Sequence, residues 1–466
     1  MNTNPLLRVR FRRFVYAFFL FTFLLSTALG QAPSGARVKN ETPKVNRANG
    51  LEILRQLKNL LDDKYYDESI SGDDVKASFA AAEERIKTLD RMSDINRTIA
   101  NVLVGLGDSH TIFYPPPLLY RVQYGFSMMM IGDGCFVATI NENSDAVAKG
   151  LKLGDRILEF NGNVPTRRNL WMIEYIIYSL EPQEEIRLKV AGADKKEREI
   201  TFQAKFISPD ERKKELKKLR ADEQSKPYTC VAIGADITAC KFRTFEVEKN
   251  VVDKMMKEVL TRKKLILDLR GNPGGYLDTQ IHFTGWFFDR EVKIGTEKTR
   301  KKAKDVVAKG RSDSFKGELI VLTDSDSASA AELFARVVQI EKRGKVVGDT
   351  SAGAVMASIP YGIATDTRVA ASINDVNIPY RVSVVSVSVA DFVMSDGSRL
   401  EGIGVLPDVS VGPTQQAMLD RNDPVLSYAA ELLGTPITPQ EAGKFYFLIP
   451  KPEAVSDKGL TEASGK

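Results

Sequence analysis

The chain has 466 residues, with 66 Lys and Arg, 61 Asp and Glu, 2 His and 3 Cys, and 43% of its residues are hydrophobic. This length allows roughly three domains, and the composition excludes collagen, a long disordered chain and a disulfide scaffold. Two histidines leave little room for a His-rich metal site and only two imidazoles for catalysis. The formal charge of +5 raises the question of a nucleic acid or anionic membrane partner, so the location of that charge matters.

Residues 1–30 have the pattern of an export signal. Four arginines precede an apolar run over residues 14–25, and Ala28 and Gly30 provide the small side chains of a cleavage site after Gly30. An uncleaved N-terminal anchor is the alternative. Without this segment 62 basic and 61 acidic groups remain. We therefore expect a periplasmic or extracellular protein with no stable membrane anchor after cleavage and no nucleic acid partner.

The next part of the chain predicts a flexible leader over residues 31–47 and helices over 48–117. One face of the first helix carries Leu54, Leu57 and Leu61. Ser93 is the expected N-cap of the last helix. The chain then passes through Ser109 and His110 to three consecutive prolines, which mark a domain boundary.

Residues 118–206 predict a compact unit of short strands and helices. A strand is expected over 135–140, and Asn161-Gly162 is typical of a hairpin turn. At these positions the unit resembles a PDZ domain. The segment in place of that family's carboxylate-binding loop consists of Tyr124, Gly125, Phe126 and Ser127. The resemblance implies that this loop binds a peptide end while the peptide adds a strand to the sheet edge.

The largest block, residues 228–412, alternates strands and helices and predicts an α/β core; residues 413–466 form a C-terminal helix and tail. Within the core, Lys and Arg exceed acids over residues 293–316, which predicts a solvated loop. Cys230 and Cys240 flank an expected hairpin, so a bridge between them is plausible in an exported chain. Three reduced, buried cysteines are an equally good interpretation.

The richest local pattern is a buried strand over residues 319–323, a short turn and a helix that starts at Ser329. Free backbone N–H groups at a helix start suit a nucleophile whose substrate becomes an oxyanion. Ser329 and Glu332 also fit a capping box, which is the more ordinary interpretation. Ser325 and Ser327 are further candidate nucleophiles that the local sequence does not exclude.

A nucleophile would need an oxyanion donor, a base and an orienting carboxylate. Gly274 and Gly275 follow a second buried strand, where they either present an N–H to a carbonyl oxygen or form an ordinary tight turn. His110 lies in a polar segment that suits a cleft, whereas His282 suits a packed position on a helix. Glu401 is a candidate carboxylate for orienting His110.

Taken in order, these motifs resemble the C-terminal processing and tricorn-like serine peptidases. The resemblance implies an α/β multidomain protein with an N-terminal helical region, a crotonase-like α/β core (a β-β-α superhelix) and an inserted PDZ domain. It implies that Ser329 is the nucleophile. The implied oxyanion donors are Ala330 with Gly274 or Gly275. The processing branch uses a lysine base where this chain has Ala354, whereas the tricorn-like branch uses groups that match Ser109, His110 and Glu401.

We therefore expect an exported serine endopeptidase that acts on peptides or unfolded protein tails, with His110 as general base and no metal or cofactor. A secreted, non-catalytic protein that binds a peptide or hydrophobic ligand on the same scaffold is the main alternative. An acyl-CoA enzyme of the crotonase type is a weaker one, because export would separate it from cytosolic CoA.

Overall fold

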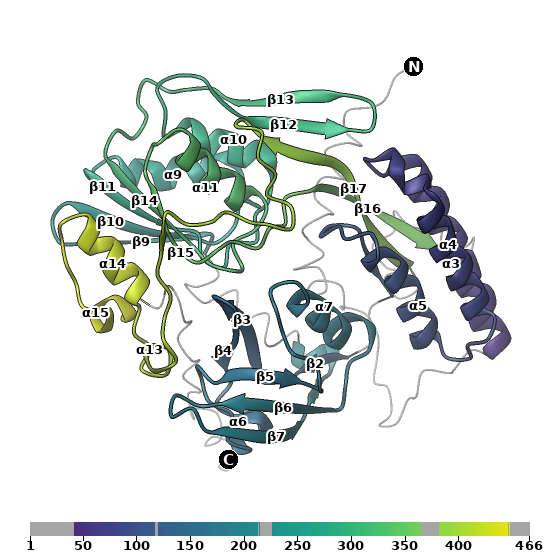
Figure 1. Ribbon diagram of the computed structural model, residues 1–466. Helices are drawn as coiled ribbons and strands as arrows, with labels where there is room; N and C mark the ends of the chain where they lie inside the picture. Colours follow the sequence, from purple (N-terminus) through teal and green to yellow (C-terminus); the bar gives the residue numbers. More distant parts are fainter. Residues whose placement is uncertain are drawn as a thin grey trace, which may run out of the picture.

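The computed structural model describes residues 42–116, 120–212, 214, 226–364, 382–445 and 447. The predicted signal peptide, most of the leader and most of the tail lie outside these residues. Figure 1 shows three regions around a common centre: an N-terminal helical region, a small β-rich unit and a larger α/β core.

The N-terminal region contains three helices, α3 (Pro43–Lys64), α4 (Asp73–Ile86) and α5 (Met92–Val104), with a 3-10 turn η1 (Glu68–Ser71). The predicted apolar face of α3 is buried. Gly50 permits close packing, because a Cβ there would lie 2.4 Å from Ile95 Cγ2. Two expectations need correction: α3 begins inside the predicted leader, with Pro43 in its first turn, and the N-cap of α5 is Arg91 instead of Ser93.

An antiparallel sheet connects this region to the core. Its strands are β1 (Ile112–Tyr114), β17 (Val382–Met394), β12 (Val292–Thr299), β13 (Ala303–Ala308) and β16 (Ala357–Ala364). The solvated loop expected over residues 293–316 is wrong, since much of it forms the β12–β13 hairpin. Its lysines are mainly on the exposed face, while Val292, Ile294 and Val306 are buried.

The β-rich unit is a five-stranded antiparallel sheet in the order β3-β4-β5-β6-β7. The strands are β3 (Phe126–Ile131), β4 (Gly134–Ile140), β5 (Arg156–Phe160), β6 (Glu185–Ala191) and β7 (Glu197–Gln203). The helices α6 (Asp145–Ala148) and α7 (Leu170–Tyr175) accompany it, and α7 continues into the π-helical turn η2 (Ile176–Leu180). The predicted Asn161-Gly162 turn is confirmed: both residues have positive φ. A two-stranded stem, β2 (Arg121–Gln123) with β8 (Lys205–Ile207), brings the ends of the unit together.

The α/β core has a six-stranded sheet in the order β18-β15-β14-β11-β10-β9. The strands are β9 (Tyr228–Ile233), β10 (Ile237–Phe242), β11 (Lys264–Asp268), β14 (Glu318–Thr323), β15 (Lys345–Gly348) and β18 (Val409–Ser410). All neighbouring pairs are parallel except β9–β10, which confirms the predicted crossover connections.

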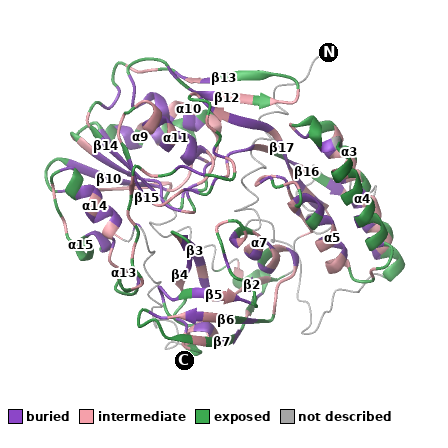
Figure 2. Ribbon diagram, viewed as in Figure 1, coloured by how far each residue is buried: buried purple, intermediate pink, exposed green. Residues whose placement is uncertain are grey.

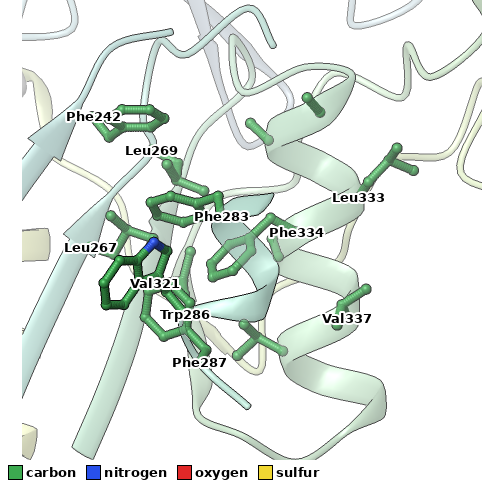
Figure 3. Packing of buried hydrophobic residues seen from close by; sticks show 14 of the residues in the cluster. Phe242, Leu267, Leu269, Phe283, Trp286, Phe287, Val321, Leu333, Phe334 and Val337 are labelled. Carbon is green, nitrogen blue, oxygen red and sulfur yellow. The ribbon is translucent and has the colours of Figure 1, made fainter. Parts of the chain in front are cut away.

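Helices cover both faces of this sheet, which is why its strands are almost wholly apolar. One hydrophobic cluster includes α9 (Lys249–Val259), α10 (Leu277–Gly285) and α11 (Ala330–Ile340); the other includes α14 (Pro424–Leu432) and α15 (Pro439–Gly443). A short helix, α13 (Gln415–Leu419), precedes α14. Figure 2 shows the buried central strands, and Figure 3 shows Phe283, Phe287 and Phe334 packed between α10, α11 and the sheet. This rigid sheet positions the loops at the carboxyl ends of β11 and β14.

A disulfide joins Cys230 on β9 to Cys240 on β10, at directly opposed positions of the hairpin. The sequence left this pairing open, and the structure decides it in favour of the bridge. Cys135, in the β-rich unit, is a buried free thiol.

Candidate active site

Ser329 lies at the junction between the loop after β14 and the start of α11. Its backbone has φ 55° and ψ −119°, whereas an ordinary N-cap residue has negative φ in the extended region. A non-glycine residue in such a conformation costs about 1–3 kcal/mol, and residues of this kind cluster at active sites. Its N–H donates to Glu332 Oε2 at 2.9 Å, so the capping interaction considered from the sequence is also present. Ser329 therefore combines a capped helix start with a strained backbone.

Two unpaired N–H groups lie beside Ser329. Gly274 contacts it so closely that a Cβ on Gly274 would lie 2.6 Å from Ser329 Cβ. The Gly274 N–H is already used, because it donates to Asn272 Oδ1 at 2.8 Å. By contrast, the N–H groups of Gly275 and Ala330 have no acceptor among the described residues. Of the two glycines suggested by the sequence, Gly275 is thus the one with a free donor.

His110 is held by one hydrogen bond of its ring and one of its backbone. Its Nδ1 shares a hydrogen bond with Ser109 Oγ at 2.7 Å, and its backbone N–H donates to Asp108 Oδ1 at 2.8 Å. Glu401 accepts the N–H of Ser109 at 3.0 Å and the N–H of Val355 at 2.9 Å. Burial lowers the pKa of His110, while the Glu401 and Asp108 carboxylates oppose that shift. The imidazole is therefore neutral at neutral pH.

The predicted nucleophile, base and orienting groups line one cavity, together with two of the three predicted oxyanion donors. Its volume is about 2790 Å³, and its lining includes Ser109, His110, Gly275, Ser329, Ala330 and Glu401. Within the described part of the chain, no hydrogen bond joins His110 to Ser329. Catalytic hydrogen bonds are often long without substrate, and both side chains line this cavity.

The other candidate residues have different surroundings. Ser327 is buried and its hydroxyl donates to Leu269 O at 2.9 Å, so it is not available as a nucleophile. Ser325 lines the cavity, but its hydroxyl oxygen is buried. His282 is bound to Asp253 at 2.6 Å and belongs to the packing of α10, as expected. Ala354 lines the cavity where a lysine base would be needed, and its N–H donates to Glu332.

The loop expected to bind peptide ends is largely packed inside its own unit. Tyr124 and Phe126 are buried, and the Tyr124 hydroxyl donates to Ile177 O at 3.0 Å. Gly125 allows Ser144 to approach, since a Cβ at Gly125 would lie 2.2 Å from Ser144 Cβ. Of the four loop residues, Ser127 lines the large cavity. Any role of the others in binding would come through their backbone.

Sequence reasoning missed several buried carboxylates that hold these loops. Asp108 accepts hydrogen bonds from His110 N, Thr111 and Ser388, and Asp324 accepts from Gly271 N and two groups of its own loop. Their partners are up to 280 residues away in the chain. No local pattern could identify those partners. The position of Asp108 directly before Ser109 and His110 was the one available signal.

Comparison with known proteins agrees with this geometry. The model of peptidase family S41 matches residues 236–411, and a PDZ domain model matches residues 122–203. A "Probable CtpA-like serine protease" of Staphylococcus aureus (strain N315) is 24% identical over 426 residues, covering 88% of this chain and 75% of that protein. A "Carboxy-terminal-processing protease" of Bartonella bacilliformis is 30% identical over 171 residues, 35% of this chain and 34% of that protein.

The fold also has a solved counterpart. The structure of mature CPAF complexed with lactacystin superposes with a TM-score of 0.59 at 13% identity, covering 87% of this chain and 99% of that one. Among the described residues, we find no helix with the length and hydrophobicity to cross a membrane. The strained serine, the two domain matches and the relatives together identify a serine-type peptidase whose core is similar to family S41 and which carries a PDZ domain.

Proposed function

We propose that this chain is an exported endopeptidase that cleaves peptides or unfolded protein tails through an acyl-enzyme on Ser329. The observation that carries the proposal is the environment of that hydroxyl: strained backbone at Ser329, free N–H groups on Gly275 and Ala330, and His110 on the wall of the same cavity. A core of the crotonase-like type is part of the same proposal.

In the first step, His110 takes the proton of Ser329 Oγ as the oxygen attacks the substrate carbonyl carbon. The resulting oxyanion accepts hydrogen bonds from the N–H groups of Gly275 and Ala330. His110 then protonates the leaving amine, and the acyl group stays on Ser329. Water, deprotonated by His110, attacks the acyl carbonyl; the bond to Ser329 Oγ then breaks, His110 returns the proton to that oxygen, and the acid is released. No metal or cofactor takes part in this sequence.

Ser109 and Glu401 would act by orienting the base. The Ser109 hydroxyl lies 2.7 Å from His110 Nδ1, and Glu401 fixes the Ser109 backbone at 3.0 Å. With the hydroxyl bound at Nδ1, the other ring nitrogen is left for Ser329. This arrangement favours the tricorn-like set of groups, since Ala354 cannot serve as a lysine base.

Export is supported by two features. The basic and apolar pattern of residues 1–30 is that of a signal peptide, and the Cys230–Cys240 disulfide suits an oxidising compartment. Detection of a mature N-terminus after Gly30 in a secreted fraction would support export, whereas full-length protein in the cytosol would contradict it.

The catalytic proposal is tested with a fluorophosphonate probe, which labels activated serines. We expect the probe to label Ser329 in the wild type and to label nothing in Ser329→Ala. In His110→Gln, the rate of labelling should fall by about 10⁴-fold or more. His282→Gln is the matched control, because it removes the other histidine and should keep the wild-type rate. Labelling that persists in Ser329→Ala would overturn the assignment, and an unchanged rate in His110→Gln would support a binding protein on this scaffold.

A further inference from the structure

Glu332 lies on the first turn of α11 and its side chain is completely buried. Four donors from two segments converge on its carboxylate. Oε1 accepts from Ser351 Oγ at 2.6 Å and from Gly353 N–H at 2.7 Å; Oε2 accepts from the N–H groups of Ser329 and Ala354, both at 2.9 Å. One side chain thus joins the candidate nucleophile to the segment over residues 351–355.

The same segment leads to the group that orients His110. Ser351 Oγ also accepts the N–H of Val405 at 2.6 Å, and the N–H of Val355 donates to Glu401. Glu332 and Glu401 therefore hold the two ends of residues 351–355. A change at Glu332 is expected to affect both Ser329 and the Glu401 side of the cavity.

Four donors need an acceptor that carries no proton of its own. A protonated carboxyl would point its O–H at one of these donors, so that two hydrogens would face each other. The short contact with Ser351 is the place where this repulsion would arise. If Ser351 Oγ instead accepted the proton of Glu332, its own O–H would lose Glu332 Oε1 as its acceptor.

We propose that Glu332 is a positioning residue whose ionised carboxylate holds Ser329 in its strained conformation, so that attack by Ser329 requires Glu332 to be deprotonated. The inference rests on the proposed function of Ser329. Because burial is the dominant effect, it raises the pKa of Glu332 to about 7, although all four hydrogen bonds lower it. The burial of His110, by contrast, lowers its pKa. Glu332 therefore loses its charge at a higher pH than the one at which the base becomes protonated.

Other titratable groups face this part of the cavity. Glu401 lies on the loop beyond residues 351–355, and Asp324 and Asp326 lie on the loop before Ser329. Burial and the nearby Asp324 and Glu174 carboxylates raise the pKa of Asp326 to about 8. A variant that shifts the titration of Glu332 without touching Asp326 is needed to separate the two. Ser351→Ala does so, since Ser351 contacts Glu332 and Val405 but not Asp326.

The test measures the rate constant of fluorophosphonate labelling of the full chain between pH 5 and pH 9. For the wild type, we expect the rate to fall below about pH 7. In Ser351→Ala, loss of a donor to the charged form should raise the pH at which the rate falls. In Glu332→Gln, labelling at pH 8 should decrease by roughly 10- to 100-fold, because the amide NH₂ faces backbone donors. Its remaining rate should then fall at a lower pH than in the wild type.

Two controls are matched to these variants. Glu341→Gln changes a carboxylate at the far end of α11 that pairs with Arg290, and Ser427→Ala removes a nearly buried hydroxyl of α14. Both should keep the wild-type pH profile. Melting temperatures at pH 8 show whether each variant folds; if Glu332→Gln does not, Ser351→Ala decides alone. Wild-type profiles in the folded variants would overturn this inference while leaving the Ser329 assignment intact, whereas labelling in Ser329→Ala would overturn the proposed function itself.

Discussion

The loops of the candidate active site and the PDZ domain are attached to the molecule in different ways. The loops are fixed by buried carboxylates: Asp108, Asp324 and Glu332 are all buried, and each accepts at least three hydrogen bonds. A buried carboxylate that loses its partners leaves several groups unsatisfied, so these loops have one favourable arrangement.

The PDZ domain meets the core mainly through half-exposed polar contacts. Arg167 pairs with Asp349 at 2.6 Å, and their side chains are 27% and 19% exposed. Gln415 on α13 donates to Gly154 O and Ala191 O. A small apolar contact between Leu153 and Met418 accompanies them. Exposed ion pairs contribute about 0–1 kcal/mol each, so the attachment of the domain to the core is weaker than that of the loops. On its other side, Tyr175 and Leu180 are buried against the N-terminal helices.

Buried hydrogen bonds thus hold the loops of the candidate site, whereas partly exposed contacts join the PDZ domain to the core. Asp349 links the two regions, because it pairs with Arg167 and lies two residues before the segment held by Glu332. Substitutions at the buried carboxylates should therefore reduce the rate of reaction with every substrate. Substitutions at the PDZ contacts should change only the handling of large substrates.

The largest effect in this comparison is expected for Glu401→Gln. The amide keeps one acceptor but turns NH₂ donors toward the N–H groups of Ser109 or Val355. We expect a loss of about 10²-fold or more in fluorophosphonate labelling with little change in melting temperature. Full labelling by the folded variant would show that Glu401 does not position His110.

Asp324→Asn should have the next largest effect. Its carboxylate joins the loop after β11 to the loop before α11, accepting from Gly271 N–H at 2.8 Å and from Ser327 Oγ at 3.1 Å. We expect a loss of about 1–3 kcal/mol in the free energy of unfolding, measured by denaturant titration, and roughly tenfold slower labelling. A stability loss without slower labelling would mean that the loops do not need this connection.

Arg167→Ala tests the PDZ side. It removes the pairing with Asp349 and the hydrogen bond to Thr350 O at 3.0 Å. We expect labelling by the small probe within about twofold of the wild type, and a change of about two- to fivefold in the digestion of an unfolded protein. An equal decrease in probe labelling and in protein digestion would contradict the division between the two regions.

The disulfide should have the smallest effect on activity. Replacing Cys230 and Cys240 with Ala removes a constraint on an edge hairpin, away from the loops after β11 and β14. We expect labelling to be unchanged and the free energy of unfolding to fall by about 2–3 kcal/mol in denaturant titration. A large loss of labelling would show that the edge of the sheet affects the site.

Much of the fold could be predicted from periodic patterns. Buried strands followed by amphipathic helices gave the parallel core, and the Asn161-Gly162 turn was recognisable because that pair readily adopts positive φ. The hairpin over β12 and β13 was missed because its exposed lysines obscured the alternation of Val292 and Ile294. The many charged residues in this segment indicated a solvated loop, although only one face of the hairpin is exposed to solvent.

The candidate site was predicted in part, because some of its features are local. The sequence by itself determined that Ser329 begins a helix, that glycines follow a neighbouring strand and that one histidine lies in a polar segment, since these depend on neighbours in the chain. Only the tertiary structure decided that Gly275 has a free N–H while Gly274 does not, and that Glu332 gathers donors from residues 351–354. Those features depend on segments that meet in space, where burial makes each hydrogen bond partner obligatory.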